Sequence, residues 1–180
     1  NNQYKQLGWG DLDYALQLGD ALPAVWLGTG RRAVSISAGG LHTCVRLDND
    51  EILCFGNPGG KLESGQRAYA VAAGGSHTCA LLNSGSFVCF GDNEFGQLGQ
   101  GDKYDRGSAV VVNLGAMRYP RTIVAGDAHT CALLDNGDVK CWGSNEYGQL
   151  GLGDTNNRGD QPGEMGDALP AVQLGDGRRA

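Results

Sequence analysis

The chain has 180 residues, enough for one domain with a sizeable core, and 31 of them are glycine, well above the usual share of roughly 7%. This composition favours tight turns over long helices. The net charge of −6 and the absence of any Lys/Arg-rich run argue against nucleic acid as a partner. No apolar stretch approaches the about 20 residues that a membrane-spanning helix needs.

The first 33 residues are predicted to form a partial repeat unit. Residues 4–11 match residues 147–154 in register, but no cysteine hairpin accompanies them. The end of the chain behaves likewise, because residues 19–25 reappear as 166–172 and residues 30–33 as 177–180. We therefore expect a single repeat array over 1–180 that belongs to a longer chain. Within it, only residues 11–18 could hold a helical turn.

Three further units follow, at 34–67, 68–120 and 121–180. Each contains the phrase Ala-Gly-x-x-His-Thr-Cys, at 38–44, 73–79 and 125–131, and a second cysteine ten residues later. Self-similarity at this period predicts an array of identical supersecondary units. The alternation of apolar and polar residues in 33–38 predicts a half-buried strand. The Asp-Asn-Gly sequence within 131–141 predicts a tight hairpin.

Glycine-rich loops follow the hairpins. Two units continue into Asn-Glu-aromatic-Gly-Gln-Leu-Gly-x-Gly-Asp, at 93–102 and 145–154, whereas the unit 34–67 keeps only Asn-Pro-Gly-Gly-Lys at 57–61. Together these phrases resemble the repeat of the RCC1 (regulator of chromosome condensation) superfamily. The resemblance implies an all-β fold, a β-propeller with blades of four antiparallel strands, of which this chain supplies about half a ring. An open half ring leaves edge blades unpaired, so more chain or a partner should close it.

The six cysteines are predicted to pair across the hairpins. Each pair lies symmetrically about its turn, and opposite residues of antiparallel strands have Cα atoms roughly 4.5 to 5.5 Å apart, which a disulfide accepts. A zinc site that includes the neighbouring histidines and a set of free buried thiols are the alternatives. Disulfides predict a location outside the reducing cytosol, in an organelle lumen or secreted, whereas free thiols predict a cytosolic or nuclear one. The expected pairs are Cys44–Cys54, Cys79–Cys89 and Cys131–Cys141.

The three histidines, His42, His77 and His129, occupy equivalent places in their units. Catalytic groups converge at one site, whereas structural groups recur with the repeat, so we expect buried histidines that hydrogen-bond to loop backbone. The sequence holds no unpaired nucleophile, HExxH motif, P-loop or unique carboxylate cluster, so we expect no enzyme, no cofactor and no metal. Asp102 and Asp154 end the Gly-x-Gly-Asp loops as turn formers, with calcium binding as the alternative.

Positions where one unit departs from the others are candidate partner contacts. Trp9 stands where the other units have Gln100 and Leu152, and Trp26 stands where the last unit has Gln173. Tryptophan is enriched at binding hot spots, so the two residues predict a contact patch. Packing against a neighbouring blade is the alternative.

The loop 155–170 is the other candidate contact, because it is rich in Gly, Asp and Asn. It includes Arg158 and Asp160, which flank a glycine and spell the adhesion tripeptide Arg-Gly-Asp, although three common loop residues also meet by chance. Trp142 takes the place of a phenylalanine in the other units and is expected to pack within its blade.

These observations favour a non-enzymatic protein-binding or scaffolding propeller. The role we expect is an accessory structural subunit of a larger assembly on a non-cytosolic face, such as a multi-subunit membrane complex. The resemblance also allows a secreted propeller of the enzyme-inhibitor type, which suits paired cysteines, or a guanine-nucleotide exchange factor for a small GTPase, which is a cytosolic or nuclear activity. Each role needs a protein partner.

Overall fold

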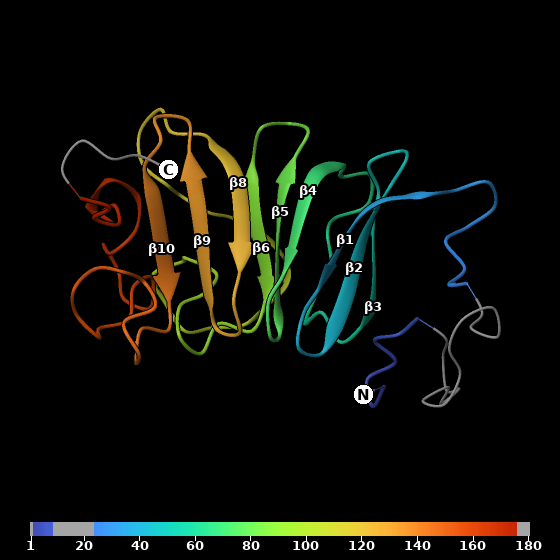
Figure 1. Cartoon of the computed structure of the whole chain (residues 1–180), viewed down its shortest axis with the longest axis horizontal. Coiled ribbons are helices and arrows are strands. Elements are labelled where there is room, and N and C mark those ends of the chain that lie inside the picture. Colours follow the sequence, from blue (N-terminus) through green and yellow to red (C-terminus); the bar gives the residue numbers. More distant parts are fainter. Residues whose placement is uncertain (1, 9–23, 176–180) are drawn as a thin grey trace.

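The computed structural model describes residues 2–8 and 24–175, and these form ten β-strands and one short 3-10 helix (Figure 1). No helix among them is long and apolar enough to cross a membrane. The predicted turn at 11–18 lies outside the described residues. In chain order, the elements are β1 (Ala33–Ala38), β2 (His42–Leu47), β3 (Ile52–Gly56), β4 (Ala68–Ala73), β5 (His77–Leu82), β6 (Phe87–Gly91), β7 (Arg106–Val111), β8 (Pro120–Ala125), β9 (His129–Leu134), β10 (Val139–Gly143) and η2 (Gly166–Ala168).

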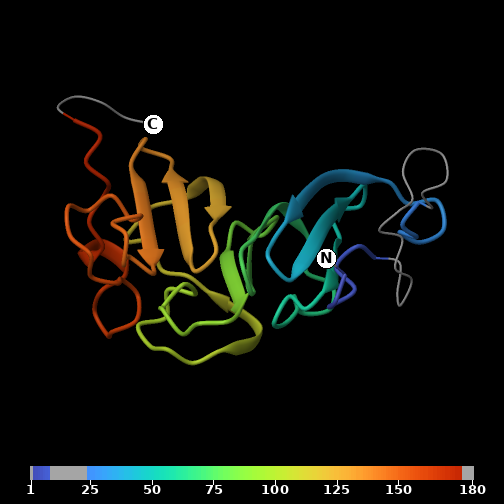
Figure 2. The ribbon, with the colours of Figure 1, turned by 60° about the horizontal axis from the view of Figure 1, so that its bottom comes forward.

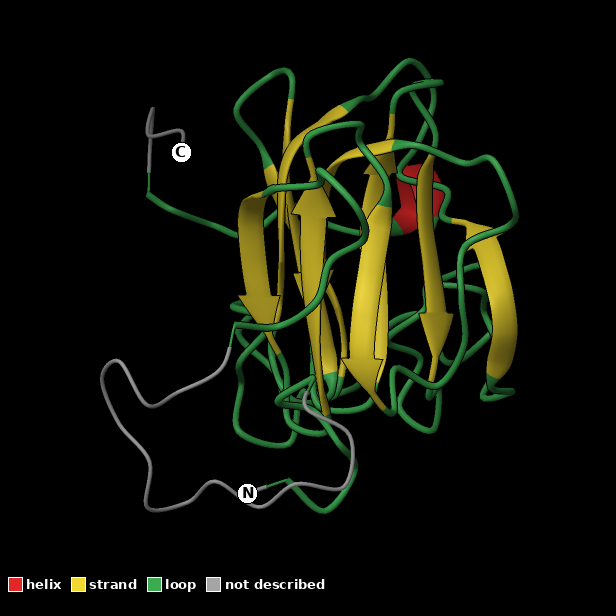
Figure 3. Cartoon of the chain, turned by 90° about the vertical axis from the view of Figure 1, so that its right-hand side faces the viewer, coloured by secondary structure: helices red, strands yellow, loops and turns green. Residues whose placement is uncertain are grey.

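The strands form three antiparallel sheets, ordered β1-β2-β3, β4-β5-β6-β7 and β8-β9-β10. Each sheet is one blade. The blades follow one another in sequence order along the molecule, with β4 in contact with β1 and β2 on one side and with β8 on the other (Figures 1 and 2). Seen from one end, the strands stand side by side and the loops gather at their two ends (Figure 3). This arrangement confirms the all-β, repeat-built fold.

The predicted hairpins are present, and their turns share one backbone conformation. Asp50, Gly85 and Gly137 occupy the same turn position and have positive φ values of 62°, 88° and 85°. The amide of Gly85 donates to the carbonyl of Leu82, and the same bond forms in the other two turns. Glycine adopts this left-handed conformation without a steric cost, which explains its recurrence there.

The core lies between neighbouring blades. The larger cluster, between the second and third blades, contains Leu81, Phe87, Leu98, Leu134 and Trp142. The Trp142 side chain is fully buried, as expected, and its ring meets that of Phe87 edge-on with centroids 5.8 Å apart. Because the second blade buries residues against both of its neighbours, the blades depend on one another for stability.

Only the second blade of the described chain has the four strands that the family resemblance implies. In the third blade, the amide of Val172 donates to the carbonyl of Val139 (2.8 Å), so residues near 172 cover the outer side of β10 without a full strand. In the first blade, residues 57–67 lead straight into β4, and the bridge they form joins Lys61 to Ser108 of β7. The short unit therefore lacks the residues that would supply its fourth strand.

Candidate functional site

The repeated phrase links each blade to the next. The His42 Nε2 atom lies 2.8 Å from the Thr78 hydroxyl, and the His77 Nε2 atom lies 2.9 Å from the Thr130 hydroxyl. The Thr130 hydroxyl donates its hydrogen to the carbonyl of Gln97 (2.9 Å), so His77 must donate through Nε2–H. His42 and His77 therefore have a structural role, but the partner of each is a threonine of the following unit and not the loop backbone that the sequence predicts.

Gln97 anchors the Gly-Gln-Leu-Gly loop of the second unit onto the third blade. Its carbonyl accepts from both the Thr130 hydroxyl and the indole N–H of Trp142 (3.0 Å). Its neighbour Leu98 is fully buried in the core between these blades. The loop of the second unit therefore belongs to the packing of the third blade.

Glycines of the phrase make room for the histidine rings. A Cβ atom at Gly74 would lie 2.2 Å from the ring of His77, and one at Gly126 would lie 2.1 Å from the ring of His129. Both distances are far shorter than a normal contact between carbon atoms. The glycine of Ala-Gly-x-x-His is therefore required because its backbone packs directly against the imidazole ring of the histidine.

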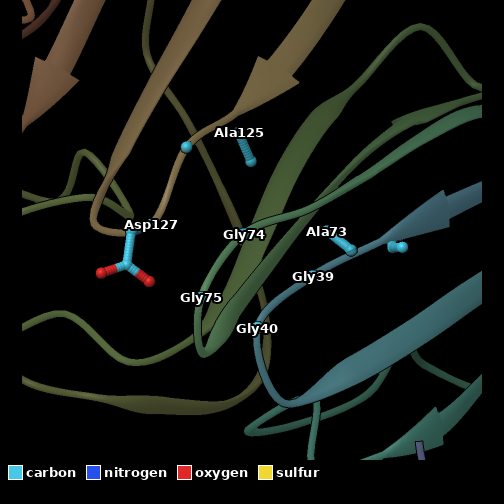
Figure 4. A pocket seen from close by; sticks show the side chains of 9 residues that line it. Gly39, Gly40, Ala73, Gly74, Gly75, Ala125 and Asp127 are labelled. Carbon is cyan, nitrogen blue, oxygen red and sulfur yellow. The ribbon is translucent and has the colours of Figure 1, made fainter. Parts of the chain in front are cut away.

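The Ala-Gly turns meet around a shallow pocket of about 280 Å³ (Figure 4). Hydrogen bonds join the turns in series, from the Gly40 amide to the Gly74 carbonyl (3.0 Å) and from the Gly75 amide to the Asp127 carbonyl (2.9 Å). Asp127 is the one charged residue of its lining, and the other eight lining residues are glycine and alanine. The pocket offers backbone and a single carboxylate, so it presents no acid–base pair.

Burial keeps the histidines neutral. It lowers the pKa of His77 to about 4, with smaller contributions from the neighbouring His42 and His129. Burial also lowers the pKa values of His42 and His129. Across 2–8 and 24–175, no group of three or more His, Cys, Asp or Glu side chains is placed to hold a metal ion. At neutral pH the His77 ring donates a hydrogen bond to the next blade, and the His42 ring shares one with Thr78.

All six cysteines form the predicted disulfides. Each blade contains one disulfide, which joins two directly opposed residues of its hairpin. The Cα atoms of the joined residues lie 4.0 to 4.1 Å apart. This distance is slightly shorter than the spacing expected for opposed residues. The structure therefore contains neither the zinc site nor the free thiols that the sequence left open.

Arg158 and Asp160 both form ion pairs within the repeat, and their assignment as partner contacts stays a prediction. Arg158 pairs with Asp154 (2.7 Å) as Arg106 pairs with Asp102 (2.6 Å), so it is a shared scaffold residue. The side chain of Asp160 is 10% exposed and pairs with Lys103 of the preceding unit (3.1 Å).

Asp102 and Asp154 stabilise their loops as expected of turn formers. The amide of Tyr104 donates to the Asp102 carboxylate, and the side chain of Asn93 donates to both the carbonyl and the carboxylate of Asp102. Asn145 and Asn156 make the corresponding bonds to Asp154. The carboxylate oxygens of both residues thus accept from arginine and amide donors of their own loops.

Trp26 is the candidate contact that the structure leaves accessible. Its side chain is 78% exposed, beside a groove of about 370 Å³ at the outer edge of the first blade. Leu27, Ile52, Leu53 and Leu62 give the groove apolar walls. Trp9, the other predicted contact, lies outside the described residues.

Lys140 is a buried charged residue that the sequence analysis did not single out. Its ammonium is buried and donates to the carbonyls of Leu114 (3.0 Å) and Gly166 (2.7 Å), and burial lowers its pKa. The other units have Leu53 and Val88 in this place before the second cysteine. The replacement of an apolar residue by lysine at this repeat position is the sequence signal that could have identified it. A lysine is rarely buried unless its ammonium is paired.

The chain folds as part of a β-propeller. Its blades are antiparallel sheets, the first strands of successive blades lie side by side, and the loop of one unit packs on the next blade. Two models of the regulator of chromosome condensation (RCC1) repeat match it, one at residues 33–61, 69–97 and 121–149 and the other at residues 136–177. These matches cover more than half of the chain. The chain belongs to the RCC1 repeat family.

Known relatives are longer than this chain. The Ultraviolet-B receptor UVR8 of Arabidopsis thaliana is 41% identical over 63 residues, which are 34% of this chain and 14% of the receptor. Human WBSCR16 superposes with a TM-score of 0.72 and 20% identity, over 96% of this chain and 46% of that one. Prp20p of Saccharomyces cerevisiae superposes with a TM-score of 0.67 and 20% identity, over 88% of this chain and 43% of that one. The structural likenesses show the fold.

Proposed function

We propose that this RCC1 repeat domain is a non-enzymatic, protein-binding scaffold, and specifically an accessory structural subunit of a larger assembly. The exposure of Trp26 beside an apolar groove carries the proposal, because a large aromatic side chain on an accessible apolar surface is typical of a binding hot spot. Prp20p, which shares this fold, binds Gsp1p and histones, so the fold is compatible with protein binding.

Two features support a role without catalysis. His42 and His77 join neighbouring blades and burial lowers their pKa values, and the pocket between the Ala-Gly turns offers one carboxylate among small residues. The alternatives of a secreted enzyme inhibitor and a guanine-nucleotide exchange factor receive no supporting contact from the described residues.

We place the domain on a non-cytosolic face, in an organelle lumen or outside the cell. The support for this is the pairing of all six cysteines, since such disulfides form and persist in oxidising compartments. Intact mass measured after alkylation of protein from its source tests the location. A gain of six hydrogen atoms on reduction is expected, whereas alkylated thiols before reduction would place the protein in a reducing compartment.

Purification of the tagged protein from its source tests the scaffold role. We expect a partner that co-elutes in constant stoichiometry through two different separations. Tyr147→Ala is the matched control for Trp26→Ala, because both side chains are aromatic and highly exposed. Loss of the partner with both variants, or elution of the wild-type domain alone, would contradict binding through Trp26.

A further inference from the structure

The first blade has an open edge where its neighbours are covered. In the second blade β7 pairs with β6, and the amide of Val112 extends this pairing by donating to the carbonyl of Phe87 (2.9 Å). In the third blade the amide of Val172 donates to the carbonyl of Val139. Ile52 is the equivalent residue of the first blade, and β3 is the last strand of its sheet in the part of the chain that is described.

The short unit explains why this edge is open. Its residues 57–67 form no strand paired with β3 in the described structure: the Lys61 amide donates to the carbonyl of Gly107 in the second blade (3.1 Å), and Lys61 and Leu62 line the same groove as Ile52. The β3 residues are accordingly only partly buried, whereas all of the equivalent β6 is buried. Backbone groups on the outer side of β3 therefore face the groove, a position that natural sheets normally protect.

The groove has the shape and chemistry of an empty strand position. Its walls are Trp26, Leu27, Ile52, Leu53 and Leu62, and charges of both signs surround it, including the ion pair of Arg67 with Glu51 (2.9 Å). Apolar walls suit an uncharged apolar side chain, and two of the surrounding charges already pair with each other. The groove therefore suits a polypeptide segment better than a charged small molecule.

We propose that β3 accepts an extended segment of a partner protein as the missing fourth strand of the first blade. The segment runs antiparallel to β3, its backbone N–H donates to the Ile52 carbonyl, and an apolar β-branched residue lies in the groove beside Trp26. The second blade supplies the template, since β7 and Val112 make this arrangement with β6. In strand addition, main-chain bonds give affinity and side-chain pockets give specificity. This inference rests on the protein-binding role proposed above and specifies its geometry.

A peptide with the sequence of residues 106–114, acetylated and amidated, is the probe. It is titrated into the whole chain carrying Trp9→Phe, so that exposed Trp26 and buried Trp142 are the remaining indoles. Saturable binding should shield Trp26 from acrylamide. The matched peptide carries an N-methyl group on the residue equivalent to Val112, which removes the one N–H that faces Ile52. We expect this peptide to bind about tenfold more weakly, the loss of one hydrogen bond that leaves a carbonyl unpaired.

Protein variants locate the site. Trp26→Ala, followed by calorimetry, should weaken binding of the parent peptide about fivefold or more, and Tyr147→Ala should leave it within about twofold. Equal binding of the two peptides would overturn strand addition. A dimer that forms through β3 and that the peptide does not dissociate would also overturn it, because a second copy would then fill the edge.

The outcomes separate this inference from the broader role. If a native partner co-elutes and is unaffected by Trp26→Ala, while the peptide does not bind, strand addition is wrong and protein binding stands. If no partner co-elutes, the scaffold role itself fails.

Discussion

His77 lies in the second unit, but its hydrogen-bond partner Thr130 lies in the third. The ring is buried, it donates through Nε2–H, and its Nδ1 atom has no partner. Protonation would place a charge at Nδ1 in a site that offers it no acceptor. A residue that recurs with the repeat thus contributes to cohesion between units, and its contribution depends on its remaining neutral.

Acid should therefore weaken the fold. His77 binds a proton in the unfolded chain near its ordinary pKa of 6.5 but in the folded chain only near 4, so the unfolded state holds more protons between these values. Stability is complete above pH 6.5 and falls as the pH drops towards 4, by about 3 kcal/mol for His77. Urea unfolding at a series of pH values measures this loss.

The control is His77→Gln, which should reduce the pH dependence between 6.5 and 4, whereas His42 and His129, whose pKa values burial also lowers, should retain their part of it. Asp50, Asp102 and Asp154 titrate below their ordinary value of 3.8 and so do not contribute in this window. If wild-type stability were constant across the window, or if NMR showed His77 protonated near pH 6, the buried neutral ring would be refuted.

Gly74→Ala should destabilise the fold by about 2 kcal/mol or more, because its Cβ would lie 2.2 Å from the His77 ring. Gly107→Ala is the matched control, since a Cβ there meets nothing within 4 Å. Thermal unfolding compares the two. Equal stability of the variants would show that the ring can move aside at little cost.

At the scale of strands and loops, the three hairpins differ in the access they give to their disulfides. Cys79 and Cys89 are both fully buried in the middle blade, whereas Cys54 and Cys131 are partly exposed. Thiol–disulfide exchange requires access to a sulfur atom. We expect a mild reductant to open Cys44–Cys54 and Cys131–Cys141 before Cys79–Cys89, as read by alkylation and peptide mapping under native conditions.

Each bridge closes a short loop, so its removal should cost about 2 to 3 kcal/mol. Cys79→Ala combined with Cys89→Ala tests this by urea unfolding.

For the order of reduction, simultaneous opening of all three bridges in the folded protein would contradict the order set by burial.

The repeat made most strands and the disulfides predictable, because opposed cysteines and turn residues report local geometry. The partners of His42 and His77 were not predictable, since Thr78 and Thr130 lie in the next unit and only the stacking of blades brings them close. The ion pair of Arg158 with Asp154, which recurs as Arg106 with Asp102, was also not predictable, because it becomes visible only when the two loops are folded. The open edge of β3 could be seen only in the structure, although the short segment 57–67 indicated that the first unit differs from the others.

At the scale of the whole molecule, the end faces of the array differ from its interior. Ile36 of β1 and Ile123 of β8 hold the same position in their units, yet Ile36 is 71% exposed and Ile123 is 7% exposed. The difference arises because a preceding blade covers Ile123. Burial, and not residue type, therefore sets what each isoleucine contributes.

Lysine substitutions at the two positions test this difference through the free energy of unfolding. Ile123→Lys should destabilise the fold by about 3 kcal/mol or more, because it places an ammonium within the core. Ile36→Lys should change the free energy of unfolding by less than about 0.5 kcal/mol, because the side chain already lies in solvent. Urea unfolding of both variants decides the matter, and sedimentation across concentrations shows whether Ile36→Lys reduces self-association. A large destabilisation by Ile36→Lys would mean that another part of the chain covers this face in solution.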